Sequence, residues 1–156
     1  HKSYRGDQQA RRIADRHYSR QKPGTDQFAP PGRLCILRIG DSALWGVVAQ
    51  EIIMHAWKKS WNNFIFRNEG AGLSSELIRQ GIAATRYILG EPPEEGLITF
   101  INREKVRKKR DFGRCYRRAG FVEVGETTER KRLVLQLPPE NWPKPEAPMG
   151  SQYLLV

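Results

Sequence analysis

A glycine-rich turn lies between an apolar segment and an amphipathic segment, and this junction constrains the fold more than any other feature of the chain. Residues 64–66 before the turn are apolar, and residues 67–75 form the turn. Apolar residues then recur at near-helical spacing: Leu73, Leu77, Ile78, Ile82 and Tyr87. Because this spacing is typical of one face of a helix, the sequence predicts a strand, a turn and a helix in direct succession.

Such a junction is suited to binding an anion. The first amides of a helix have no intrahelical partner, and the helix dipole places partial positive charge there. Gly70 and Gly72 carry no Cβ that would block a phosphate from the backbone. Glycine-containing helix starts also occur in proteins that bind nothing. A turn without a ligand therefore remains the alternative. The spacing lacks the Gly-Lys-Ser/Thr ending of a P-loop and the three glycines of a dinucleotide fingerprint.

The remaining patterns predict a single domain with a mixed α/β sheet. A helix is predicted over residues 7–20, a hairpin from residues 34–39 and 43–49, and a strand at 63–66. The later elements are a helix over 73–89 ended by Gly90, a strand at 97–101, a helix or loop over 103–119, and strands at 121–127 and 131–137. Residues 1–137 are assigned to the domain, and the proline-rich segment 138–156 is predicted to be an irregular tail.

Positive charge is in large excess and is clustered. The chain has a net charge of +10 and a pI of about 10.0. Clusters of this kind favour contact with nucleic-acid phosphates through counterion release. We therefore expect double-stranded DNA as a partner, although a solvated basic face or a contact to a cofactor phosphate would give the same pattern. The residues assigned to this role are Arg11, Arg16, Arg20, Lys105, Arg107, Lys108, Lys109 and Arg110.

Hydropathy and the polar N-terminus favour a soluble, intracellular protein. No apolar run is long enough to span a bilayer, and the first residues are polar and basic rather than signal-like. We therefore expect no membrane partner and a cytoplasmic location. The two cysteines, Cys35 and Cys115, are too few for a zinc site or a disulfide scaffold.

Two motifs resemble the GNAT superfamily of N-acetyltransferases. Arg67-x-x-Gly70-Ala71-Gly72 is similar to the superfamily's Arg/Gln-x-x-Gly-x-Gly/Ala pyrophosphate loop. The second block contains Asn102 after a strand and a Tyr116-x-x-x-Gly120-Phe121 turn. The resemblance covers residues 33–137 and implies a largely antiparallel central sheet flanked by helices, with acetyl-CoA or a related acyl donor as cofactor. The implied cofactor residues are Arg67, Asn68, Gly70, Ala71, Gly72, Ser74 and Asn102.

The resemblance also implies a role for Tyr116, because superfamily members often protonate the departing CoA thiolate from this position. A packing tyrosine beside Phe121 is the alternative. Likewise, Ser74 is an ordinary residue for a first helical turn, and Asn102 is an ordinary turn former. Glu69 would be electrostatically unfavourable beside a pyrophosphate, so it is expected to face solvent.

A polar group before the first long strand is the candidate acceptor site. It contains His17, Tyr18, Arg20 and Asp26, followed by Phe28. Histidine suits acid-base chemistry near neutral pH, and tyrosine can donate a proton or stack on a base. A histidine satisfied by one hydrogen bond within a helix is the simpler alternative. We assign His17, Tyr18, Asp26 and Tyr116 as candidate catalytic residues, and Phe28, His55 and Trp57 as a base pocket, although tryptophans often belong to the core.

The His17-Tyr18 pair, the glycine loop and the basic segments together resemble the Mom family of phage DNA hypermodification proteins, a divergent GNAT branch. That family converts adenine in DNA to N6-acetamido (carbamoylmethyl) adenine, which shields phage DNA from host restriction enzymes. An iron requirement is associated with it, and His17 and His55 are the candidate ligands. No two-histidine-plus-carboxylate spacing supports a metal site, so the metal stays open. A conventional acyl-CoA N-acetyltransferase and a non-catalytic nucleic-acid-binding protein are the alternatives.

Overall fold

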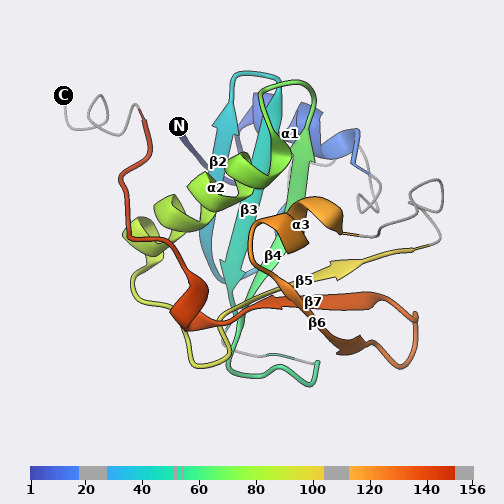
Figure 1. The fold of residues 1–156 in the computed structure, drawn as a ribbon. Helices are drawn as coiled ribbons and strands as arrows, with labels where there is room; N and C mark the ends of the chain where they lie inside the picture. The colour runs from blue at the N-terminus through green and yellow to red at the C-terminus, as the bar shows by residue number, and fades with distance from the viewer. Residues whose placement is uncertain (18–27, 51–52, 54, 104–112, 150–156) are drawn as a thin grey trace.

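The structure is a computed structural model that describes residues 1–17, 28–50, 53, 55–103 and 113–149. Its elements are β1 (Lys2–Ser3), α1 (Gln8–Asp15), β2 (Arg33–Ile39), β3 (Ala43–Ala49), β4 (Trp61–Asn68), α2 (Ser74–Leu89), β5 (Leu97–Ile101), α3 (Arg114–Arg118), β6 (Val122–Glu126), β7 (Leu133–Leu137) and the 3-10 turn η1 (Pro139–Asn141). Seven strands form one sheet in the order β1-β2-β3-β4-β5-β7-β6 (Figure 1). The predicted single-domain mixed α/β fold with a largely antiparallel sheet is confirmed.

The local predictions agree closely with these bounds. The hairpin of β2 and β3, the glycine junction before α2, and β5 all lie where the sequence predicts them. The two-residue strand β1 was not predicted, and the sheet order places β7 between β5 and β6. The predicted helix over 7–20 is helical over Gln8–Asp15, and residues 18–20 lie outside the described part. Of the segment 103–119, residues 104–112 also lie outside it.

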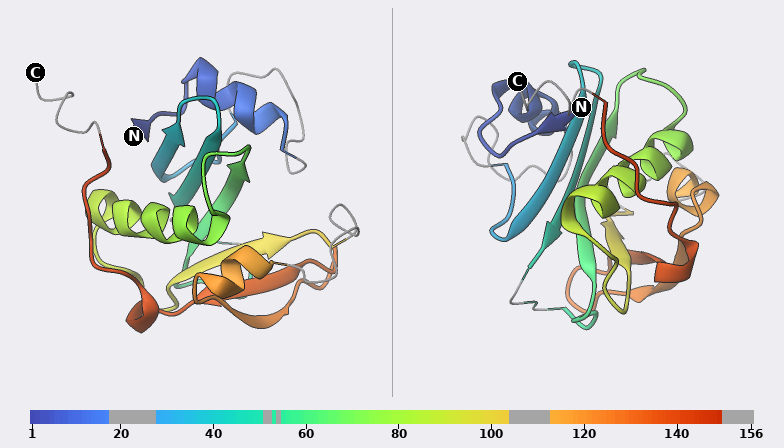
Figure 2. Two further views of the ribbon diagram at one scale, coloured as in Figure 1. Left: turned by 45° about the horizontal axis from the view of Figure 1, so that its top comes forward. Right: turned by 90° about the vertical axis from the view of Figure 1, so that its left-hand side faces the viewer.

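Helices cover both faces of the sheet. Figure 2 shows α1 on one face and α2 with α3 on the other. Beneath α1, an apolar cluster joins Ala10, Ile13 and Phe28 to strand residues such as Leu44 and Ile65. The larger core lies on the α2 side; its fully buried members include Ile78, Ile82, Leu97 and Leu135. Burial of these side chains is the main stabilising term for a domain of this size.

The proline-rich segment after β7 packs along α2. Trp142 is buried and its ring meets Trp61 edge-to-face with centroids 5.8 Å apart. Arg86 Nη1 donates to Pro143 O at 3.0 Å, and Glu146 N donates to Ala83 O at 3.1 Å. The described part of the predicted tail, residues 138–149, is thus irregular apart from η1 but is packed on the domain.

β4 and β5 are parallel neighbours that diverge after only two paired positions. They pair only at Trp61 with Leu97 and Asn62 with Ile98, near the start of both strands. Figure 1 shows β5, β7 and β6 fanning away from β2, β3 and β4 beyond that point. Since both strands continue past the last pair, a gap opens between their carboxyl ends.

Asp7 joins α1 to β2 through one carboxylate. Its oxygens accept hydrogen bonds from Gln9 N at 3.0 Å, Ser3 Oγ at 2.6 Å and Arg38 Nε at 2.7 Å, so it is both the N-cap of α1 and an ion-pair partner. Partial burial alone would raise the pKa of Asp7, but the hydrogen bonds from Ser3, Arg38 and Gln9 outweigh it and hold the pKa below its ordinary value.

Replacing Asp7 tests this junction. We expect Asp7→Ala to lower the free energy of unfolding by about 1–2 kcal/mol, because it removes an N-cap and leaves Arg38 without its carboxylate partner. Asp7→Asn keeps a capping oxygen and should cost less. A carboxyl whose pKa is lowered in the folded state stabilises the fold at pH values above its ordinary pKa of about 3.9. This stabilisation is lost as the pH falls through the folded-state pKa. Urea unfolding of the three proteins at neutral and acidic pH measures both effects; equal acid sensitivity in the wild type and Asp7→Asn would contradict the account.

Candidate functional site

A cavity of about 930 Å³ lies where β4 and β5 diverge. Volumes of this order accommodate cofactors and drug-sized ligands. Its wall is built from both strands, the glycine turn, the first turn of α2, one side of α3 and the residue two positions after α1. The lining residues include three arginines, Arg67, Arg114 and Arg118, and none of the described ones is an aspartate or glutamate. The site therefore favours an anionic ligand on charge alone.

A β-bulge in β4 shapes the floor of the cavity. Gly46 pairs with Ile65 and Val47 pairs with Asn63, so Phe64 has no partner on β3. A Cβ on Gly46 would lie 2.5 Å from the Phe64 ring, so glycine alone fits beneath that ring. The extra residue increases the local twist and bends β4, which is a common use of bulges beside functional sites.

Asn63 ties the bulge together. It is only 2% exposed, and its Nδ2 donates to Gly46 O at 2.8 Å and Ile65 O at 3.0 Å. Across the gap, Thr99 Oγ1 donates to the Asn63 carbonyl at 3.2 Å. Backbone pairing between β4 and β5 has ended here, so a side chain supplies the bond between the strands. These bonds fix the gap at its narrow end.

Tyr116 reaches the same asparagine from α3. Its hydroxyl donates to Asn63 Oδ1 at 2.5 Å, and its ring packs edge-to-face against Phe66 and Phe121. The amide orientation is determined by chemistry, because Nδ2 faces two carbonyls and only Oδ1 can accept from the hydroxyl. Tyr116 therefore lies in the cavity wall as the resemblance implies, and it also has the packing contact with Phe121 that the alternative predicts.

The glycine turn is held by Asn68 at the end of β4. Its Oδ1 accepts from Gly70 N at 3.2 Å and Ala71 N at 2.9 Å, while its Nδ2 donates to Gly72 O at 2.7 Å and Ser74 Oγ at 2.9 Å. Gly70 has φ 95°, a conformation that other residues adopt only under strain. Asn68 thus binds the backbone amides of Gly70 and Ala71, two residues that the sequence assigns to cofactor binding.

The start of α2 remains open to a ligand. The N-cap is Leu73, whose side chain makes no capping hydrogen bond, and Ser74 and Ser75 line the cavity. The first-turn amides and the positive end of the helix dipole therefore face a space that also holds Arg67. The first-turn amides of α2 are therefore more accessible to an anion than the amides of Gly70 and Ala71, which Asn68 already binds.

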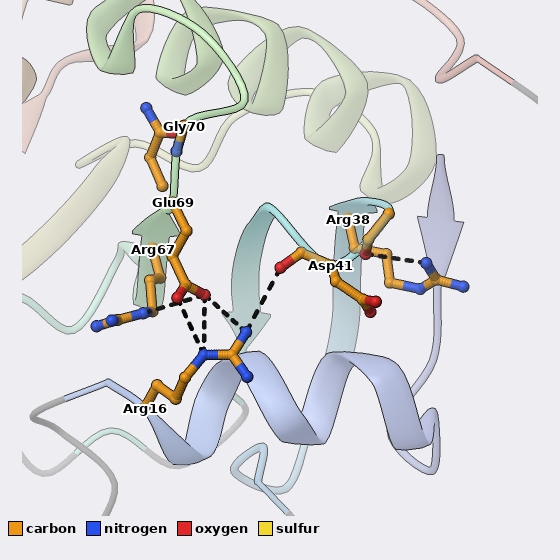
Figure 3. Close-up of polar contacts among 8 residues, drawn as sticks. Arg16, Arg38, Asp41, Arg67, Glu69 and Gly70 are labelled. Carbon is orange, nitrogen blue, oxygen red and sulfur yellow. Dashed lines mark hydrogen bonds and ion pairs between the residues drawn. The ribbon is translucent and has the colours of Figure 1, made fainter.

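Glu69 is turned away from the cavity. Figure 3 shows its carboxylate directed toward α1, where it meets the Arg16 guanidinium. Hydrogen bonds from Arg16 outweigh the small effect of desolvation and, with Arg67 at 3.4 Å, hold the pKa of Glu69 below its ordinary value. The carboxylate therefore stays ionised near neutral pH, and it pairs with Arg16, which is not a lining residue, and with Arg67 in the cavity wall.

The structure brings only some of the predicted site residues to the cavity. His17, Arg67, Asn68, Gly72, Ser74 and Tyr116 line it. Asn102 follows the last residue of β5 and is not among the lining residues. Tyr18, Arg20, Asp26, Lys105, Arg107, Lys108, Lys109 and Arg110 lie outside the described residues.

The three residues assigned to a base pocket lie elsewhere. Phe28 is 8% exposed and packs in the core beneath α1, because the segment entering β2 crosses that face of the sheet. His55 and Trp57 pack against Phe100, with ring centroids 5.4 Å and 6.5 Å from it. Phe100 lines the cavity, whereas His55 and Trp57 are not among the lining residues, so these two adjoin the site only through Phe100. Burial lowers the pKa of His55 despite the nearby Glu95 carboxylate.

Several cavity residues were not singled out from the sequence. Asn63 and Thr99 are polar positions within apolar strands, which is the one signal that could have identified them. Arg114 and Arg118 are four residues apart, so they lie on one side of α3. Of the predicted DNA contacts in the described part of the chain, Arg16 pairs with Glu69 and Arg11 lies in α1.

Within the described ranges, no group of three or more His, Cys, Asp or Glu side chains is placed to hold a metal ion. No helix in that same part of the chain combines the length and apolar character needed to cross a bilayer.

No family model, curated protein or solved structure matches the chain. The likeness to the GNAT superfamily and to its Mom branch therefore rests on the sequence motifs alone.

Asn63 and its neighbour Asn62 form a matched test of the bulge. Asn63→Ala leaves two backbone carbonyls and the Tyr116 hydroxyl without this partner, so we expect the free energy of unfolding to fall by about 3 kcal/mol. Asn62 Oδ1 is buried without a hydrogen-bond partner, so Asn62→Ala should change stability by about 1 kcal/mol or less. Chemical denaturation of both variants measures the difference, and equal losses would refute the role given to Asn63.

Proposed function

We propose that the chain is a GNAT-type transferase of the Mom kind, which takes a CoA-type donor and converts adenine in double-stranded DNA to N6-acetamido (carbamoylmethyl) adenine. Such a modification would protect phage DNA from host restriction enzymes. The observation that carries the proposal is the cavity between β4 and β5, whose described wall holds three arginines and the open start of α2 but no carboxylate.

The donor side of the cavity suits a pyrophosphate with an attached arm. Ser74, Ser75 and Arg67 would hold the pyrophosphate, because helix amides and a guanidinium both donate hydrogen bonds to phosphate oxygens. Apolar residues such as Phe66 and Ile101 line the same space and would contact the arm. An acyl-CoA supplies an acyl group activated as a thioester. The charge of the described lining residues and a volume of about 930 Å³ are therefore compatible with this group.

The acceptor side is supported by charge and by His17. A net charge of +10 favours DNA, and a base modified inside a duplex must be flipped into a pocket that stacks against it. Phe64, Phe66 and Tyr116 line the cavity and supply aromatic surface. His17 lies in the wall and is the candidate to take a proton from the adenine N6 amino group, since histidine exchanges protons near neutral pH.

The bond formed in the product limits which reaction the chain can catalyse. In N6-acetamido adenine the new bond joins N6 to a methylene carbon and not to an acyl carbon, so simple acetyl transfer does not produce it. The chemistry assigned to the chain is therefore donor binding, N6 as the acceptor atom, and the positions of His17 and Tyr116 beside it.

Mass analysis of DNA tests the proposal. Bacteria would express the wild type, His17→Ala, Ser74→Glu and Gln80→Glu, and their DNA would be digested to nucleosides. Ser74→Glu places a carboxylate in a cavity that favours anions, while a carboxylate near a helix N-terminus does not weaken the helix. Gln80→Glu adds the same charge at an exposed position of α2 and serves as the control.

We expect a new, heavier deoxyadenosine with the wild type and with Gln80→Glu, and a loss of about tenfold or more with His17→Ala and Ser74→Glu. Unmodified DNA in every case would contradict the proposal. CoA turnover on a protein or small amine would then favour a conventional N-acetyltransferase. DNA binding without turnover would favour a non-catalytic nucleic-acid-binding protein.

A further inference from the structure

The glycine loop is bound to helix α1 through one carboxylate. Both oxygens of Glu69 lie 3.0 Å from Arg16 Nε, and Oε2 accepts a second hydrogen bond from Arg16 Nη2 at 2.7 Å (Figure 3). A guanidinium that meets a carboxylate through two nitrogens has a defined orientation, unlike a single lysine contact. Arg16 and Glu69 are separated by 53 positions in the sequence, so the pair joins two distant segments.

Two further contacts fix this carboxylate in place. The backbone amide of Glu69 donates to Ser42 O at 2.6 Å, and Arg16 Nη2 donates to Asp41 O at 3.4 Å. Three segments therefore meet here: the end of α1, the turn between β2 and β3, and the glycine loop. An isolated surface ion pair is weak, but a charge held by several partners loses less freedom when it pairs.

Arg16 is also the residue that leads directly into His17. It forms the C-cap of α1, and His17 N donates to Ala14 O at 2.9 Å to close the last turn. His17 lies in the wall of the cavity, whereas Arg16 points along the outside of the glycine loop. Because the two residues are adjacent, the position of the Arg16 guanidinium restricts where the His17 side chain enters the cavity.

Glu69 in turn belongs to the donor side of the site. It lies between Arg67, which lines the cavity, and Gly70 of the turn held by Asn68. The same carboxylate oxygen that accepts from Arg16 lies 3.4 Å from Arg67 Nε. One carboxylate thus contacts an arginine on each side of the site, one beside His17 and one in the donor wall.

We propose that Arg16 is a positioning residue: its ion pair with Glu69 docks the end of α1 on the glycine loop and holds His17 in the cavity wall, so that the acceptor side is aligned with the donor loop. This inference rests on the function proposed above. It replaces the role that the sequence suggested for Arg16, because a guanidinium engaged by Glu69 is not available as a simple contact to DNA phosphates.

The positioning role and the phosphate-contact role predict opposite effects of Glu69→Gln. If the ion pair positions His17, Arg16→Ala and Glu69→Gln both lower the rate of adenine modification, each by about fivefold, and the double variant loses no more than either single variant. If Arg16 instead contacts phosphate, Arg16→Ala weakens DNA binding, whereas Glu69→Gln removes a nearby negative charge and strengthens it.

Arg12→Ala is the matched charge control. Arg12 is an exposed residue of the same helix, so this substitution removes one positive charge from α1 without cutting the ion pair. The positioning account predicts that Arg12→Ala changes DNA affinity as much as Arg16→Ala does but leaves the turnover rate at saturating DNA close to that of the wild type. Equal turnover rates for Arg12→Ala and Arg16→Ala would overturn it.

A second readout does not depend on activity. The chain contains three histidines, so the ring resonances of His17 can be assigned by comparison with His17→Ala. We expect Arg16→Ala and Glu69→Gln to shift and broaden the His17 ring resonance, and Arg12→Ala to leave it unchanged. An unaltered His17 resonance in all three variants would overturn the positioning role whatever the substrate is. Shifted resonances in a protein that modifies no DNA would retain the docking of α1 and reject the proposed function alone.

Discussion

The parting of β4 and β5 is the constraint on which the site depends. Two parallel strands that paired along their whole length would leave no room between them. Here backbone pairing ends after Asn62 and Ile98, the bulge at Phe64 bends β4, and Thr99 bridges to Asn63 where the backbone no longer does. Polar side chains therefore complete hydrogen bonds that would otherwise be lost in a buried region, where an unpaired carbonyl is costly.

The described cavity wall carries positive charge, whereas the Glu69 side chain is directed away from it. Arg67, Arg114 and Arg118 contribute to the described wall, and Glu69, the acidic residue of the glycine turn, is directed outward to Arg16. A carboxylate left inside would repel a phosphate, whereas outside it joins two segments of the fold. The same residue thus removes a repulsion from the donor side and adds a contact on the acceptor side.

Local patterns were predictable and distant contacts were not. The glycine junction, the β2–β3 hairpin and β5 follow from apolar spacing and turn residues that lie close together in the chain. Asn63 gains its role only when Tyr116, which lies 53 positions away, reaches it from α3. Phe28 was assigned to a base pocket because it follows a polar segment, but the path of the chain into β2 buries it beneath α1. Arg16 was assigned to DNA as a member of a basic group, and its pairing with Glu69 could not be predicted because the two residues lie 53 positions apart.

Protection of Cys115 by CoA tests the central claim most directly. Cys115 lines the cavity, whereas Cys35 is 1% exposed and burial raises the pKa of its thiol to about 11, so Cys35 serves as an unreactive internal control. Alkylation of the native protein with a small thiol reagent, followed by peptide mass analysis, would measure both residues with and without CoA. The account predicts that Cys115 reacts faster than Cys35 and that CoA slows its labelling by about fivefold or more at saturation. Labelling of Cys115 that is unaffected by CoA would contradict the assignment of the cavity between β4 and β5 as the donor site.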